Sequence, residues 1–237
     1  PATAQGAVIG KELRLYSRSM LRSVQLMIAF LVGVLVCVIP ALSGVSLMLP
    51  FAGAPFTAIA IAVNCNLYGD DGSALWLTLV TPGVARADVR GRQWAWLLVA
   101  GPAGLLLTVV LTAVSGQGWA WPWALAAEPG LLLGGAGVVV LVSILTPYPL
   151  TPTGGPTPQR QVKVNLMLLA APVLTLGPAL ALLIAGTASG EPAVRWLAVP
   201  VALGWGALLC WGLGRLAVRR LERRGPELFA QVRKPAG

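Results

Sequence analysis

Six long apolar stretches run through the sequence and leave few folds open to it. Each approaches the roughly 20 apolar residues that a helix needs to cross the hydrocarbon core of a bilayer. Only 11% of the residues are charged, whereas soluble domains carry about 25%. We therefore predict an all-α, polytopic membrane protein with six transmembrane helices. The expected spans are residues 24–42, 47–68, 94–114, 129–147, 164–185 and 196–213.

The basic residues beside these stretches predict the orientation of the chain. Cytoplasmic segments of membrane proteins carry an excess of Lys and Arg. With a cytoplasmic N-terminus, 16 of the 17 basic residues fall on cytoplasmic segments and only Arg195 falls outside. We expect both termini in the cytoplasm, and we attribute the net charge of +9 to this topology rather than to nucleic-acid binding. The first stretch is expected to stay as a span rather than act as a cleaved signal peptide, because five more follow.

The residues that most enzymes use are scarce. The chain has no histidine, which excludes Ser-His-Asp and Cys-His pairs and His-rich zinc sites. Its three cysteines are far apart, and we expect them to be apolar core residues. The glycine-rich segment 134–137 lies inside a span and lacks the lysine and hydroxyl of a phosphate-binding loop. We therefore expect no ATP hydrolysis, metal or cofactor in this chain.

None of the eight acidic residues falls in the middle of an expected span. Carriers driven by protons or sodium usually place a carboxylate there, so the sequence argues against ion coupling. The nearest candidate is Glu128, directly before the Pro129 that opens the fourth span, and we interpret it as solvated at the outer interface.

Three parts of the chain follow from this plan: an interfacial helix (1–23), a six-span domain (24–214) and a basic tail (215–237). The tail is interpreted as an anchor attracted to anionic lipid. The N-terminal part is predicted to be one amphipathic helix over 9–25 that lies in the membrane interface. An alternative is a simple anchor that sets the topology. The basic residues of the helix predicted over 9–25 share one face through spacings of three and four: Lys11, Arg14, Arg18 and Arg22.

The loop between the second and third spans, residues 69–93, is the most informative cytoplasmic segment. Residues 73–80 are apolar and predict a short helix that ends at Pro82–Gly83. Such a helix is too short to span, so we expect it to lie flat at the inner surface and present one face to a partner. The alternative is a re-entrant or buried packing helix without a partner.

Two further patterns concern the bundle itself. Five prolines within 147–163 favour an extended connector rather than a helix. Pairs of small residues at Gly130 and Gly134, and at Ala202 and Gly206, predict close contacts between helices.

The loop and the N-terminal helix resemble the ABC-2 type permeases, the membrane subunits of bacterial ATP-driven exporters. Asn66, Gly69, the Asp71–Gly72 pair, Pro82 and the Gly91–Arg92 pair carry the resemblance, together with the opening residues 11–14. The resemblance implies that residues 72–82 form the coupling helix, which docks into a groove on a separate ATPase subunit, and that the N-terminal helix packs nearby and moves with it. The implied coupling residues are Asp71, Gly72, Leu75, Trp76, Leu79, Pro82, Arg90, Gly91 and Arg92.

The resemblance also implies its partners: a nucleotide-binding subunit that holds ATP and Mg, a second six-span unit, and the lipid of the cell membrane. The short outer segment 186–195 departs from family members that carry re-entrant helices there. Since the expected spans lack polar groups, we expect a hydrophobic or amphipathic cargo such as a drug, antibiotic or lipid. Two other hypotheses stay open: a membrane-embedded enzyme that acts on a lipid or isoprenoid through Asp70 and Asp71, and a non-transporting assembly subunit.

Overall fold

The computed structural model describes residues 3–81, 83–148 and 158–232, and every regular element in these ranges is helical. A helix satisfies all of its backbone hydrogen bonds within one segment, which favours this outcome for long apolar stretches in a membrane. In chain order the elements are α1 (Ala4–Arg18), α2 (Met20–Leu42), η1 (Ser46–Phe51), α3 (Gly53–Val63), α4 (Leu67–Asp71), η2 (Gly72–Ala74), α5 (Leu75–Val80), α6 (Ala85–Ser115), η3 (Gly118–Ala120), α7 (Trp121–Leu145), α8 (Pro158–Ala188) and α9 (Pro192–Val232).

Five of these helices are long and apolar enough to cross a membrane, which is consistent with a membrane-embedded protein. They correspond to the first, third, fourth, fifth and sixth predicted spans. The outer surface of the bundle is rich in exposed apolar side chains, as on Met27, Leu31 and Ile39 of α2. An apolar surface of this extent is expected where lipid rather than water surrounds a protein.

The second predicted span, 47–68, is not one continuous helix but is divided among η1, α3 and α4. Pro50 lies in η1 and supplies no backbone N–H, so the first break is local in origin. At the other end of α3, the Asn64 side chain donates to the Ala60 carbonyl at 2.8 Å and competes for this acceptor with the Asn64 backbone N–H, which lies 3.2 Å away. With 11 residues, α3 is about 16 Å long, roughly half the thickness of a hydrocarbon core.

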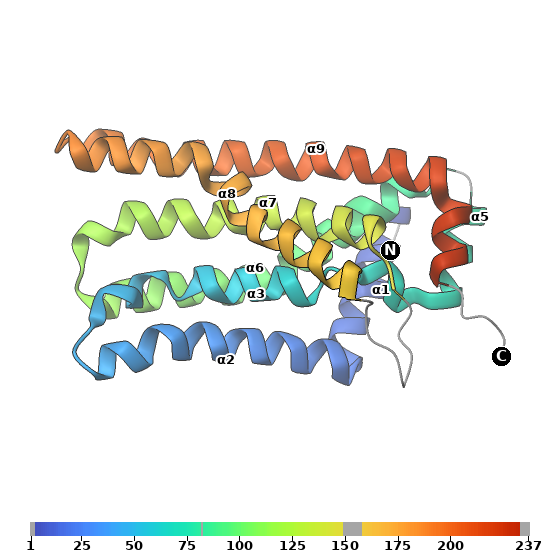
Figure 1. The fold of residues 1–237 in the computed structure, drawn as a ribbon, viewed down its shortest axis with the longest axis horizontal. Coiled ribbons are helices and arrows are strands. Elements are labelled where there is room, and N and C mark those ends of the chain that lie inside the picture. Colours follow the sequence, from blue (N-terminus) through green and yellow to red (C-terminus); the bar gives the residue numbers. More distant parts are fainter. Residues whose placement is uncertain (1–2, 82, 149–157, 233–237) are drawn as a thin grey trace.

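The bundle is built around α7, which is the most buried of the long helices (Figure 1). It packs against α3 and α6 on one side and against α8 and α9 on another, while α2 lies outside α3. α1, α5 and the last turns of α9 lie together at one end, which we call the terminal end (Figure 1). The short connections after α2, α6 and α8 lie at the opposite end.

Four helices continue beyond the apolar residues that define the predicted spans. α6 begins at Ala85 rather than at residue 94, so Arg86, Arg90 and Arg92 are helical rather than part of a loop. α8 begins at Pro158, inside the predicted extended connector, of which residues 149–157 lie outside the described ranges. α7 begins at Trp121, with Pro122 in its first turn. The expected tail is helical: α9 continues to Val232 and kinks at Arg224 (φ −126°, ψ 22°).

The N-terminal region also differs from the prediction, because one helix over 9–25 does not form. Ser19 is extended (φ −82°, ψ 110°) and separates α1 from α2. The Ser23 hydroxyl donates to the Tyr16 carbonyl at 2.8 Å, which satisfies an acceptor that the break leaves open. Arg22 therefore belongs to α2 and does not share a helical face with the basic residues of α1.

The predicted close contacts of small residues are confirmed between α7 and α9. A Cβ atom on Gly206 would lie 3.0 Å from the Leu133 Cβ and 3.2 Å from the Gly130 carbonyl oxygen. A Cβ on Gly130 would lie 3.4 Å from the Ala202 Cβ. The two backbones approach closely because neither helix carries a large side chain at this level.

This contact allows a matched test on a single helix. Gly206→Leu is expected to lower the free energy of unfolding by about 1–3 kcal/mol, because the added atoms cannot fit between α7 and α9. Gly204 lies on the same helix with nothing within 4 Å of an added Cβ, so Gly204→Leu is the control and should have little effect. Thermal unfolding of the purified variants in detergent measures both. Equal effects at the two positions would contradict the packing described here.

Candidate functional site

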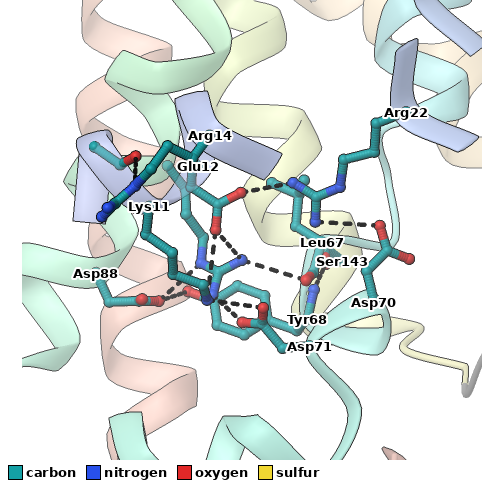
Figure 2. A network of polar contacts seen from close by, with 12 residues as sticks. Lys11, Glu12, Arg14, Arg22, Leu67, Tyr68, Asp70, Asp71, Asp88 and Ser143 are labelled. Atoms are coloured by element: carbon teal, nitrogen blue, oxygen red, sulfur yellow. Dashed lines mark hydrogen bonds and ion pairs between the residues drawn. The ribbon is translucent and has the colours of Figure 1, made fainter. Parts of the chain in front are cut away.

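A cluster of buried charges joins α1, α2, α4 and α6 at the terminal end (Figure 2). Glu12 lies between Arg22 and Lys11, and accepts from Arg22 Nη1 at 2.6 Å. Its other oxygen lies 3.0 Å from Arg92 Nη1. We call this set the charge cluster; its members are Lys11, Glu12, Arg22, Asp70, Asp71, Asp88 and Arg92.

Arg92 is the centre of the cluster and is almost fully buried. Its guanidinium contacts Asp71 through Nη2, Asp88 through Nε at 3.0 Å, and Glu12 through Nη1. It also donates to the Leu67 carbonyl at 3.2 Å and stacks 4.3 Å from the centre of the Tyr68 ring. A planar guanidinium has five donors and can serve several partners at once, which a lysine ammonium cannot do with the same geometry.

The other members complete the links between helices. Lys11 Nζ donates to Asp71 Oδ1 at 2.8 Å, and Arg22 Nη2 lies 3.3 Å from Asp70 Oδ2. The Tyr68 hydroxyl donates to Asp88 Oδ2 at 2.6 Å. Each carboxylate of the cluster thus has a cationic partner, as buried charges require. The cluster fixes the start of the segment 72–80 to α1, α2 and α6.

The two aspartates of α4 respond to this environment in opposite ways. Burial alone would raise the pKa of Asp71, but the charges of Arg92 and Lys11 and their hydrogen bonds outweigh it, so the pKa lies below its usual value. Burial raises the pKa of Asp70 against the opposing attraction of Arg22. The lowered pKa of Asp71 stabilises the folded state above the usual carboxyl pKa, and this stabilisation is lost as the pH falls through the lower folded-state value.

The predicted helix of the loop is present as η2 followed by α5, and its side chains face two ways. Leu75 is fully buried in the core of the protein, and Leu79 faces α9, where it would contact a Cβ on Gly225 at 2.7 Å. Trp76 (49% exposed), Leu77 (56%) and Val80 (66%) point outward. We call these three residues the exposed α5 face. Asp71 and Gly72 precede it, Gly72 with a positive φ of 54°, and Pro82 lies outside the described residues.

The remaining predicted site residues are distributed among four environments. Gly91 packs against α1, where its Cβ would lie 2.6 Å from the Val8 side chain. Arg14 and Arg18 are exposed on α1, whereas Arg22 is buried and Lys11 is ion-paired. The prediction that all four side chains form one basic face toward lipid is therefore wrong, because Lys11 and Arg22 belong to the charge cluster. Arg90 lies outside the charge cluster, beside a pocket on α6 and α9.

Sequence reasoning missed Glu12, Tyr68 and Asp88 as parts of the site. The Asp88–Arg92 pair has the i,i+4 spacing of a helical ion pair and could have been recognised once α6 was extended to Ala85. Glu12 and Tyr68 gave no such signal, because their partners are far away in the chain. Among the described residues, no three His, Cys, Asp or Glu side chains form a group that could hold a metal ion.

Glu128 is a second buried polar site, and the prediction that water solvates it is wrong. It lies within α7 and is 1% exposed, because this helix begins seven residues before it. Thr57 of α3 donates to its Oε1 at 2.6 Å. Oε2 and the nearby Thr108 hydroxyl have no hydrogen-bond partner, and Gly53 and Gly104 leave the space that the carboxyl fills. The sequence argument against a mid-bundle carboxylate therefore fails at this position.

Two substitutions at Glu128 separate the role of its charge from that of its shape. Glu128→Gln keeps an oxygen that can accept from Thr57 and removes the charge, so the free energy of unfolding should change by less than about 1 kcal/mol. Glu128→Ala leaves a cavity and an unpaired Thr57 hydroxyl, and should destabilise by about 2–3 kcal/mol. Thermal unfolding in detergent measures both variants. If the glutamine variant is as unstable as the alanine variant, the charge itself stabilises the site.

Comparison of this chain with the models of known protein families, with curated proteins and with solved structures finds no match.

Proposed function

We propose that this chain is the membrane-spanning permease subunit of an ATP-driven exporter, as its resemblance to the ABC-2 type permeases implies. The observation that carries the proposal is the exposed α5 face, held by the charge cluster beside α1 and α6. Three large apolar side chains on a short helix at the end of a bundle favour contact with another protein. That partner is a separate nucleotide-binding subunit in the cytoplasm.

The charge cluster provides a physical route from this face to the bundle. Asp71 directly precedes η2 and α5, and it is bound to Lys11 of α1 and Arg92 of α6. A displacement of α5 by the ATPase would therefore move α1 and α6 as well, rather than deform a loose loop. A second copy of the bundle completes the pathway, and the cargo is a hydrophobic or amphipathic compound.

Orientation follows from charge. The helical segments at the terminal end carry most of the basic residues, and the positive-inside rule supports our proposal that this end faces the cytoplasm. In this orientation α1 and the last turns of α9 lie on the side where ATP is available.

The alternative of a lipid-modifying enzyme gains no support from the site, because Asp70 and Asp71 are both engaged by basic side chains. Reconstitution in vesicles with the ATPase subunit tests the proposal directly. ATP-dependent movement of a hydrophobic dye is expected with wild type and not with an ATPase whose hydrolysis is disabled. A complex that forms and hydrolyses ATP but moves no compound from a panel of amphiphiles would instead support the assembly-subunit hypothesis.

A further inference from the structure

A basic pocket lies between α6 and α9 at the terminal end, and no member of the charge cluster lines it. It has a volume of about 270 Å³. Four arginines line it: Arg86 and Arg90 of α6, and Arg215 and Arg219 of α9. Among the described residues, none of the four takes part in an ion pair. Four neighbouring cations without a carboxylate repel one another, so the pocket favours an anion.

A second, more apolar pocket of about 360 Å³ continues from the first toward the middle of the bundle. The two share Arg90, Gln93 and Trp211 in their linings. Trp94 and Leu97 of α6 and Ala207 of α9 line the apolar part. Because they share these lining residues, the two pockets adjoin each other, and we call them together the groove, which is charged at one end and apolar at the other.

The order of residues along both helices gives this groove a direction. On α6 the arginines at 86 and 90 precede Trp94 and Leu97, and on the antiparallel α9 Arg219 and Arg215 follow Trp211 and Ala207. Spacings of three and four residues place each set on one helix face. From Arg90 to Leu97 the helix rises about 10 Å, which lies within the depth of one leaflet, about 15 Å.

We propose that this groove binds an anionic phospholipid, with its phosphate among the four arginines and an acyl chain along the apolar part. Guanidinium groups bind phosphate through paired hydrogen bonds, and basic pockets between membrane helices bind anionic headgroups. The Arg215 guanidinium already lies 4.1 Å from the centre of the Trp211 ring, which holds it at the mouth of the groove. The site is independent of ATPase docking, since the exposed α5 face does not line it.

Lipid binding to the purified full chain tests the proposal, with bound lipid counted by native mass spectrometry. The probes are phosphatidylglycerol, phosphatidylcholine with the same acyl chains, and inorganic phosphate. Wild type should bind phosphatidylglycerol at least tenfold more tightly than phosphatidylcholine. Arg90→Gln with Arg215→Gln should remove this preference. The matched control is Arg18→Gln with Arg223→Gln, which removes two exposed charges outside the groove. Such charges attract anionic lipid only diffusely, so this pair should retain the preference of the groove for phosphatidylglycerol.

A third variant tests the apolar part without a change of charge. Ala207→Trp fills the groove and should weaken phosphatidylglycerol binding severalfold while leaving the thermal midpoint near that of wild type, because Ala207 is exposed. The proposal is overturned if the control pair loses as much binding as the groove pair, since the attraction is then diffuse. It is also overturned if inorganic phosphate displaces the lipid at equal concentration and Ala207→Trp has no effect, since the site then holds a free phosphate.

Discussion

Arg92→Ala is expected to lower the free energy of unfolding by about 3–5 kcal/mol, the range found when one partner of a buried ion pair is removed. The guanidinium is almost fully buried and serves Glu12, Asp71 and Asp88 at once. Without it, two of these carboxylates keep only partial compensation from Lys11 and Arg22, and Asp88 keeps only the Tyr68 hydroxyl. Thermal or denaturant unfolding in detergent measures the loss.

Two further variants test whether this loss of stability is specific to Arg92. Arg86→Ala removes an exposed arginine from the same helix and should change stability by no more than about 0.5 kcal/mol. Arg92→Lys keeps the charge but cannot contact three carboxylates in the same geometry, so its stability should lie between that of wild type and Arg92→Ala. Similar unfolding of Arg86→Ala and Arg92→Ala would show that the charge cluster contributes little to the fold.

Trp76→Asp combined with Leu77→Asp is expected to abolish co-purification of the ATPase subunit and ATP-driven transport. Both side chains are about half exposed, so the substitution should leave the fold intact. Placing charges in the centre of an apolar interface should cost at least 2 kcal/mol, which is a loss of affinity of about 30-fold. Pull-down of the proposed ATPase subunit with the purified protein measures this loss.

The choice of residues in this test follows from the structure. Leu75 is buried, so a charge there would unfold the protein and report on stability alone. Ser189→Asp is the control, because Ser189 is exposed on the turn between α8 and α9 at the opposite end of the bundle. An ATPase subunit that binds the Trp76, Leu77 double variant as tightly as wild type would remove α5 from the interface.

Hydropathy predicted the positions of five long helices well, because an average over many residues is insensitive to their ends. The same averaging hid the breaks around α3, where Pro50 and Asn64 act on single hydrogen bonds. It also misplaces Glu128: the apolar run starts at Pro129, but the helix starts earlier, because a proline can lie inside a membrane helix whose freed carbonyl finds another partner.

The candidate site could be predicted only in part. The resemblance pointed to Asp71 and Arg92, and the structure brings these two side chains into contact. Their burial could not be read from the sequence, because it depends on α1 and α4 meeting α6 across separations of many residues. Ser19 is the clearest case: an ordinary residue in an apparently continuous helix turns the chain so that Arg22 reaches Glu12.

The position of Asp71 also limits how this protein can be re-engineered. Since one guanidinium joins Glu12, Asp71 and Asp88, the segments that carry them form a matched set that must be exchanged together. Under the proposed function, a chimera that imports the loop of an ABC-2 type permease to recruit a different ATPase subunit should therefore join the sequences after Asp71. A junction placed before Asp71 would put a foreign residue beside Arg92. The chimera would then change both the binding of the ATPase subunit and the stability of its own fold.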